Sequence, residues 1–111
     1  MNKKLFLRNG LLNLFNLTCK YYEVSNNYIQ DFSSREQTKI NIRKMFIYQA
    51  DKIYRYWFGS QEKLFFEINE LLKIKYNNYL YYIRNRKGQI ETCKDIKAEY
   101  KRYNKYIIEN I

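Results

Sequence analysis

The chain contains no proline and only three glycines, Gly10, Gly59 and Gly88, in 111 residues. Proline breaks a helix because it removes a backbone donor and clashes with the preceding turn, so nothing here prevents long helices. Apolar residues recur at intervals of three and four residues, and the alternation typical of strands is missing. This spacing predicts one apolar stripe of Leu11, Leu12, Leu14, Phe15, Thr18 and Tyr22, and another of Ile42, Phe46, Ala50, Ile53 and Trp57. It also predicts that Leu80 and Ile83 face inward. We therefore expect an all-α protein, a compact bundle of about six helices in one domain over residues 1–111.

The turn and cap residues place the ends of these helices. Ser25 is expected to cap the second helix, and Ser33 with Glu36 fits a capping box that opens the third. Gly59 and Gly88 are expected to end the third and the fifth helices. The expected helices start or run as follows: from about residue 9, over 26–32, over 34–58, over 61–74, over 77–87, and from about residue 93 onwards.

The chain is strongly basic, with 21 Lys and Arg against 11 Asp and Glu and a formal net charge of +10. So high a charge on a small domain favours a polyanionic partner, although lysine-rich composition alone accounts for part of the excess. In the last helix four lysines cluster within one arc, away from the apolar stripe of Cys93, Ile96, Tyr100, Tyr103 and Ile107. This arc is either a solvated face or a strip that faces phosphates. Its members are Lys94, Lys97, Lys101 and Lys105.

Several functional classes find no support in the sequence. There is no His, and Cys19 and Cys93 stand far apart, so we expect reduced thiols and no metal or cofactor. No motif of a nucleophile with its base, and no glycine-rich phosphate loop, is present, so we do not expect an enzyme. The start MNKKLFLRNG lacks the long apolar run of a signal peptide, and no segment could span a membrane. We expect a cytoplasmic protein.

The order of segments resembles one family. The stretch YYEVSNNYIQDFSSREQTKINIRKMFIYQA is similar to the opening of the C-terminal DNA-binding domain of the bacterial replication initiator DnaA, in the stand-alone form found in phages. The resemblance covers roughly residues 11–108 and implies a Trp-repressor-like helical domain with a helix-turn-helix, whose second helix reads the major groove. The matching residues are Tyr21, Tyr22, Val24, Ser25, Ser34, Arg35, Arg43, Tyr48 and Ala50.

The resemblance also assigns roles and shows where they are lost. It implies that Arg35 enters the minor groove. Where the family has its Arg-Asp-His-x-Thr readout cluster, this chain has KYNNY at residues 75–79, and Asn69 replaces the glycine at which the helix pair approaches. We therefore expect the family's fold here, but we do not expect this chain to recognise the DNA sequence that the family binds.

The sequence predicts a small, phage-encoded nucleic-acid-binding protein that favours duplex DNA, with RNA possible. Asn77 is interpreted mainly as a helix cap, while Asn78 and Tyr81 could read or stack on bases and Arg84 could contact guanine or phosphate. The alternative is an anti-CRISPR-type inhibitor that reuses the fold to bind an RNA-guided nuclease or its guide RNA. A third possibility is a dimer that pairs through Tyr100 and Tyr103. The full set of candidate contacts is Arg35, Lys39, Arg43, Lys44, Lys75, Asn77, Asn78, Tyr81, Arg84, Arg86, Lys94, Lys97 and Lys101.

Overall fold

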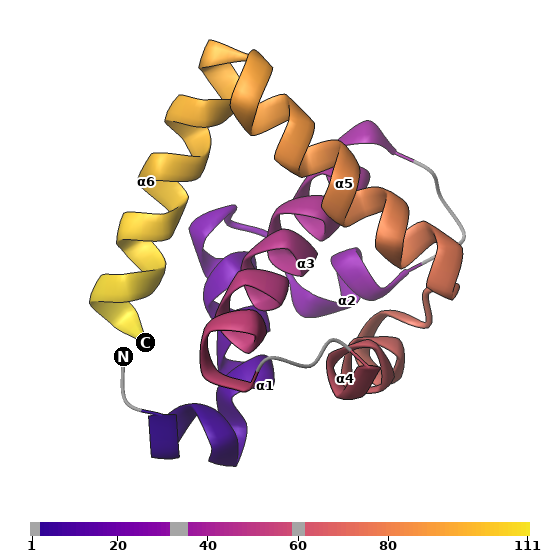
Figure 1. The fold of residues 1–111 in the computed structure, drawn as a ribbon, viewed down its shortest axis with the longest axis vertical. Helices are drawn as coiled ribbons and strands as arrows, with labels where there is room; N and C mark the ends of the chain where they lie inside the picture. Colours follow the sequence, from indigo (N-terminus) through magenta and orange to yellow (C-terminus); the bar gives the residue numbers. More distant parts are fainter. Residues whose placement is uncertain (1–2, 32–35, 59–61) are drawn as a thin grey trace.

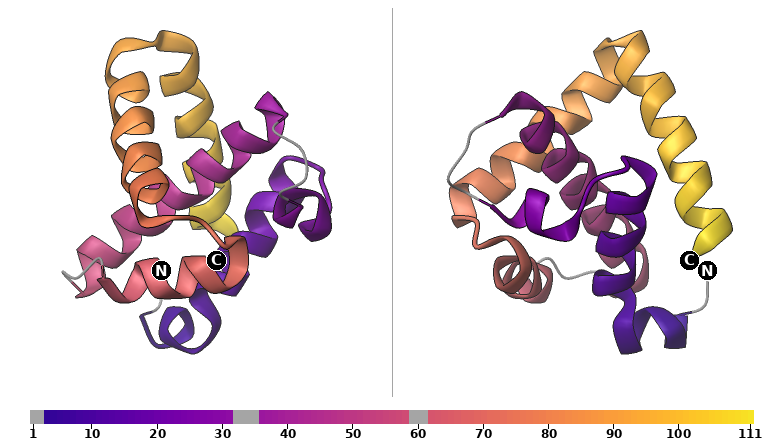
Figure 2. Two further views of the ribbon diagram at one scale, coloured as in Figure 1. Left: turned by 90° about the vertical axis from the view of Figure 1, so that its right-hand side faces the viewer. Right: turned by 180° about the vertical axis from the view of Figure 1, so that it is seen from behind.

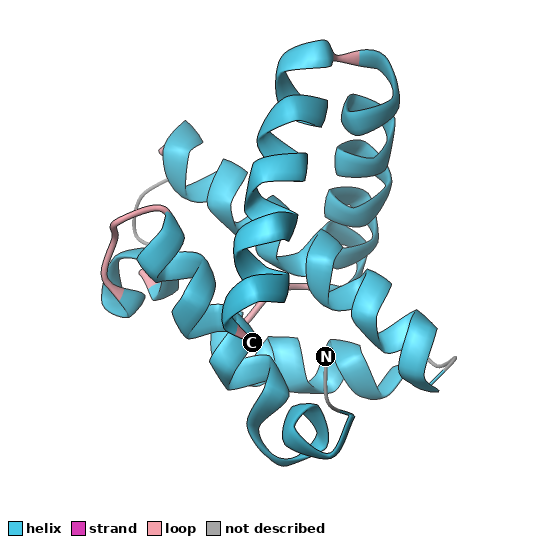
Figure 3. Cartoon of the chain, turned by 90° about the vertical axis from the view of Figure 1, so that its left-hand side faces the viewer, coloured by secondary structure: helices cyan, strands magenta, loops and turns pink. Residues whose placement is uncertain are grey.

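The computed structural model describes the backbone of residues 3–31, 36–58 and 62–111, and the side chains of residues 10–31, 36–56 and 64–111. These ranges are helical apart from short connections, without a strand, which confirms the predicted all-α class (Figure 3). The predicted capping box at Ser33 and the helix stop at Gly59 lie outside the described residues. The elements are α1 (Lys3–Tyr21), α2 (Asn26–Gln30), α3 (Gln37–Phe58), α4 (Glu62–Leu72), α5 (Tyr76–Thr92) and α6 (Lys94–Asn110).

Helix α3 runs through the middle of the molecule (Figures 1 and 2). It contacts α1, α2, α4 and α5, while α6 packs on α5 and α1. Ten consecutive residues of α3, 42–51, are buried, so this part of the helix has no solvent-facing side. A helix covered on all sides must find internal partners for every polar side chain it carries.

The core joins residues that are distant in the sequence. Phe15 of α1 meets Phe46 of α3 edge-to-face, with ring centroids 5.3 Å apart. The buried hydroxyls of Thr18 and Tyr103 lie 2.7 Å apart and link α1 to α6. Tyr100 and Tyr103 are buried within the chain, so they do not form the exposed seam that the third possibility, a dimer, would need.

Most of the residues predicted on the apolar stripes of α1 and α3 are buried, while Tyr22 is half-buried and the side chain of Trp57 lies outside the described residues. The α3 stripe of Ile42, Phe46, Ala50 and Ile53 is buried as expected. Leu12, which was expected on the apolar stripe of α1, is instead 49% exposed. The residues of the same stripe that are buried are Leu11, Leu14, Phe15 and Thr18.

Two helices end on a residue with left-handed backbone. After α1, Glu23 has a φ of 56°, and the amide of Val24 donates to the carbonyl of Cys19 over 2.9 Å. After α4, Lys73 has a φ of 47°, and its amide donates to the carbonyl of Asn69 over 2.8 Å. These hydrogen bonds satisfy carbonyls that a helix end leaves open, at positions where glycine is the usual residue.

Helix α5 is longer than predicted. It continues through Gly88 to Thr92, so the expected stop at Gly88 is wrong. The single residue Cys93 separates α5 from α6, and the two helices form an inverted V in Figure 1. Both cysteines are free thiols, with Cys19 buried and Cys93 half-buried.

Within the described ranges, none of the helices combines the length and apolar character that crossing a membrane requires.

Candidate nucleic-acid interface

Helix α5 begins at the edge of the molecule, after a short connection. Residues 73–75 join it to α4, which Figure 1 shows end-on while α5 runs across the view. The two helix axes are therefore far from parallel. The first three residues of α5, Tyr76, Asn77 and Asn78, are all exposed.

The start of α5 corrects the interpretation of Asn77. The residue at the N-cap is Lys75, which has extended backbone and makes no side-chain capping bond. Asn77 is the second residue of the helix, so it is not the cap that the sequence suggested. The side chains of Asn77 and Asn78 are both exposed, which places two carboxamides at the accessible end of α5.

The two sides of α5 differ in character. Tyr79, Ile83 and Arg86 are buried against the rest of the protein. Asn77, Tyr81 and Arg84 are exposed, and Tyr81 is 56% exposed. Because these three positions are spaced four and three residues apart, they share one side of the helix. We call the exposed set Asn77, Asn78, Tyr81 and Arg84 the α5 face.

The α5 face lies in an acid-free segment. Residues 71–90 contain five basic residues and neither Asp nor Glu. Four of the five are exposed, so this segment itself carries no negative charge that would repel a polyanion. Two of these, Lys73 and Lys87, were missed as candidates, although the run without acids is visible in the sequence. The exposed four are Lys73, Lys75, Arg84 and Lys87.

Lys44 of α3 supports the α5 face from beneath. Its Nζ donates to the side-chain oxygen of Asn85 over 2.7 Å and lies 5.5 Å from the ring centroid of Tyr81 and 5.7 Å from that of Tyr82. Burial, followed by the charge of Arg86, lowers the pKa of Lys44. Lys44 is therefore buried and positions aromatic rings, and it does not present its charge on the surface as expected.

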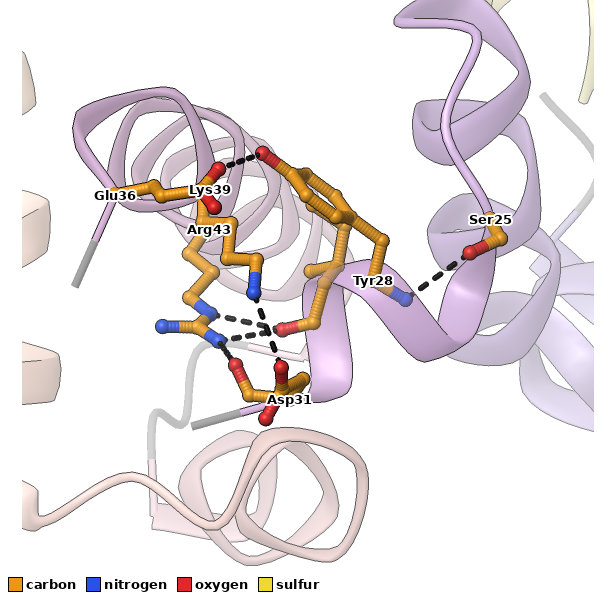
Figure 4. A network of polar contacts seen from close by, with 7 residues as sticks. Ser25, Tyr28, Asp31, Glu36, Lys39 and Arg43 are labelled. Atoms are coloured by element: carbon orange, nitrogen blue, oxygen red, sulfur yellow. Dashed lines mark hydrogen bonds and ion pairs between the residues drawn. The ribbon is translucent and has the colours of Figure 1, made fainter. Parts of the chain in front are cut away.

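Lys39 and Arg43 are internal as well (Figure 4). Lys39 is 3% exposed, pairs with Asp31 over 3.2 Å and lies 4.6 Å from the ring centroid of Tyr28. Arg43 is 4% exposed and donates to the backbone carbonyls of Ile29 and Asp31. The expectation that both side chains project towards phosphates is corrected by these contacts, which bind α2 to α3.

Arg86 is the fourth candidate that lies inside. It is 2% exposed, and its Nη2 donates to the backbone carbonyl of Asn41 over 3.1 Å. Among the described residues its Nε has no acceptor. Burial lowers the pKa of Arg86, while the nearby Glu99 and Tyr22 act in the opposite direction. Arg86 therefore joins α5 to α3 and is not accessible to a groove.

The basic residues of α6 remain on the surface. Lys94, Lys97 and Lys101 are all exposed, on the side of α6 away from buried Tyr100 and Tyr103. Lys105, in the same arc, lies 4.0 Å from Glu109. Arg35 lies outside the described residues.

No protein-family model, no curated protein and no solved structure matches this chain. Among the described residues no group of three or more His, Cys, Asp and Glu side chains could hold a metal ion.

Proposed function

We propose that this chain is a small nucleic-acid-binding protein whose α5 face enters the major groove of duplex DNA. The observation that carries this proposal is an exposed helix side with asparagine, tyrosine and arginine, in a segment of 20 residues, 71–90, without an acid. Carboxamide and guanidinium groups are the side chains that best pair with base edges.

The form of α4, the connection 73–75 and α5 suits this role. Two helices that cross steeply through a connection of three or four residues are typical of a helix-turn-helix, in which the second helix reads the groove. With 17 residues, α5 is about 25 Å long. A helix with its side chains is about 10–12 Å wide, and the major groove of DNA is about 12 Å wide. The exposed side of α5 can therefore fit into the groove.

Each part of the α5 face then has a distinct task. Asn77 and Asn78, in the first turn, can pair with N6 and N7 of adenine. Arg84, two turns later, can pair with guanine or with a phosphate. Exposed lysines before and after the face supply phosphate contacts, which position the helix without reading sequence. They are Lys73, Lys75 and Lys87, with Lys94, Lys97 and Lys101 of α6 as an outer strip.

The test is equilibrium binding of random duplex DNA, single-stranded DNA and structured RNA across a salt series. The proposal expects duplex DNA to bind best, with an affinity that falls steeply as salt rises because counterions are released. Asn78→Ala should weaken binding to a selected duplex by roughly tenfold or more, since a good bidentate pair contributes about 1–3 kcal/mol. Asn13→Ala, an exposed asparagine on α1, is the matched control. Absence of duplex binding at low salt would contradict the proposal.

A second candidate function has its own supporting observation. Phe66 of α4 is 63% exposed, and Tyr76, the first residue of α5, is 51% exposed. Large exposed aromatic side chains are typical of protein interfaces, and this favours an inhibitor of the anti-CRISPR type that binds an RNA-guided nuclease. In a cleavage assay with the guide-loaded nuclease, such an inhibitor would lose activity on Phe66→Ala and Tyr76→Ala. A DNA reader would leave cleavage unchanged in this assay.

A further inference from the structure

A second surface feature lies away from the α5 face. A pocket of about 410 Å³ opens between the C-terminal halves of α3 and α6. This volume is within the range of about 300–1,000 Å³ that holds small ligands. In Figure 1 the C-terminal half of α6 lies on the left and the start of α5 on the right, so the two surfaces are separate.

The polar wall of the pocket is a chain of hydrogen bonds with one direction. The hydroxyl of Tyr100 donates to Oε1 of Gln49 over 2.7 Å, and Nε2 of Gln49 donates to Oδ1 of Asn104 over 2.7 Å. In this arrangement Asn104 ends the chain with its Nδ2, which carries two N–H donors.

The same wall carries a positive charge. Nζ of Lys52 lies 5.1 Å from the ring centroid of Tyr100 and 5.5 Å from that of Tyr48, within the range of cation–π attraction. Lys52 lines the pocket, and neither Asp nor Glu is among the described residues that line it. The pocket thus offers N–H donors and a cation, which match the oxygens of an anion.

The remaining wall is apolar, and two of its three side chains are exposed to solvent. It is formed by Ile53, Tyr56 and Ile108, of which Tyr56 is 80% exposed and Ile108 is 56% exposed. A flat ring that covers these side chains would remove their apolar surface from water. The pocket therefore combines a wall for a ring with donors for an acidic group.

We propose that this pocket binds a small planar anion, in which a flat ring rests on Ile53, Tyr56 and Ile108 and an acidic group meets Lys52 and Asn104. A nucleoside monophosphate has both parts and is the probe of choice. This inference does not depend on the function proposed for the α5 face.

Calorimetric titration of the full chain with AMP and CMP tests the proposal. AMP or CMP should bind. Two partial ligands should each bind at least tenfold more weakly than AMP. Adenosine has the flat base without the charge, and ribose 5-phosphate has the charge without the flat base. No binding of AMP or CMP at millimolar concentration, or equal binding of ribose 5-phosphate and AMP, would overturn the proposal.

Three variants locate the site. Asn104→Asp keeps the oxygen that accepts from Gln49 but replaces the two donors with a negative charge, so binding should fall more than tenfold. Lys52→Gln and Tyr56→Ser, both at exposed positions, should each weaken binding severalfold. Lys101→Gln, an exposed lysine of α6 outside the pocket lining, and Tyr81→Ser on the α5 face should leave it unchanged. Binding that survives all three pocket variants would overturn the assignment.

Discussion

Arg43 binds the backbone of Ile29 through two hydrogen bonds. Nε and Nη2 of its guanidinium both donate to the carbonyl oxygen of Ile29, over 2.9 and 2.7 Å. Nη2 also donates to the carbonyl of Asp31 over 2.6 Å. These carbonyls lie at the end of α2, where a helix leaves its acceptors open. A helix of five residues is too short to be stable alone, so α2 depends on this contact with α3.

Replacing Arg43 with Met should therefore destabilise the protein. Met fills much of the same space but leaves two carbonyl oxygens without their donors. We expect the free energy of unfolding to fall by roughly 2–3 kcal/mol, the cost of losing buried hydrogen bonds to a charged group. Urea unfolding measures this. Arg84→Met, at an exposed position, should change it by about 0.5 kcal/mol or less, and equal effects of the two substitutions would contradict the account.

The buried hydroxyl pair of Thr18 and Tyr103 should be energetically coupled. Thr18 donates its single hydroxyl hydrogen to the carbonyl of Leu14 over 2.7 Å, so Tyr103 is the donor between the two hydroxyls. Thr18→Val leaves the Tyr103 hydroxyl without an acceptor and should cost roughly 1–3 kcal/mol. Tyr103→Phe should cost about 1 kcal/mol. In a double-mutant cycle by urea unfolding, the double variant should lose less stability than the sum of the singles, and simple additivity would contradict this geometry.

Gly88→Ala should stabilise the protein. Gly88 lies within α5, and a Cβ built on it meets nothing within 4 Å. Alanine loses less backbone entropy than glycine in a helix, so we expect a gain of roughly 0.5–1 kcal/mol in the free energy of unfolding. Thermal unfolding should show a higher Tm. A lower Tm would mean that the helix does not continue through residue 88.

Alkaline solution should unfold the protein through its buried tyrosines. Burial raises the pKa of Tyr79, Tyr100 and Tyr103 above the usual value of about 10. In the unfolded chain these groups ionise near pH ~10, while in the folded chain they keep their protons. The stability is thus fully present below that pH and is lost as the pH rises above it. Urea unfolding from about pH 8 to about pH 11 should show this decline, and a constant value over that range would contradict it.

The sequence predicted the helical class because the apolar spacing is regular, and it placed Ile42, Phe46 and Ala50 in the core for the same reason. It did not predict that residues 42–51 of α3 are covered on all sides. Charged residues are rarely buried unless they have partners, so Lys39 and Arg43 were assigned to the surface. Their partners in α2 and in the segment after it become visible only when the helices are packed together.

The candidate interface was predicted in part for a related reason. The exposed positions of Asn78, Tyr81 and Arg84 follow from helical spacing around the buried Ile83. Arg86 lies three residues after Ile83, and the same spacing places it on the buried side. Its charge was nevertheless taken as a sign of exposure. The pocket between α3 and α6 could not be foreseen, because it depends on how two separate helices meet.

The most direct test of the central claim compares two variants that lose the same charge at different places. Arg84→Gln removes a positive charge from the α5 face, and Lys20→Gln removes one from the exposed surface of α1. Both are titrated against the same duplex DNA at several salt concentrations, with folding checked by circular dichroism. If the α5 face enters the groove, Arg84→Gln weakens binding at least tenfold at low salt, while Lys20→Gln changes it by less than about twofold. Equal effects of the two substitutions, or no effect of either, would show that α5 is not the surface that binds DNA.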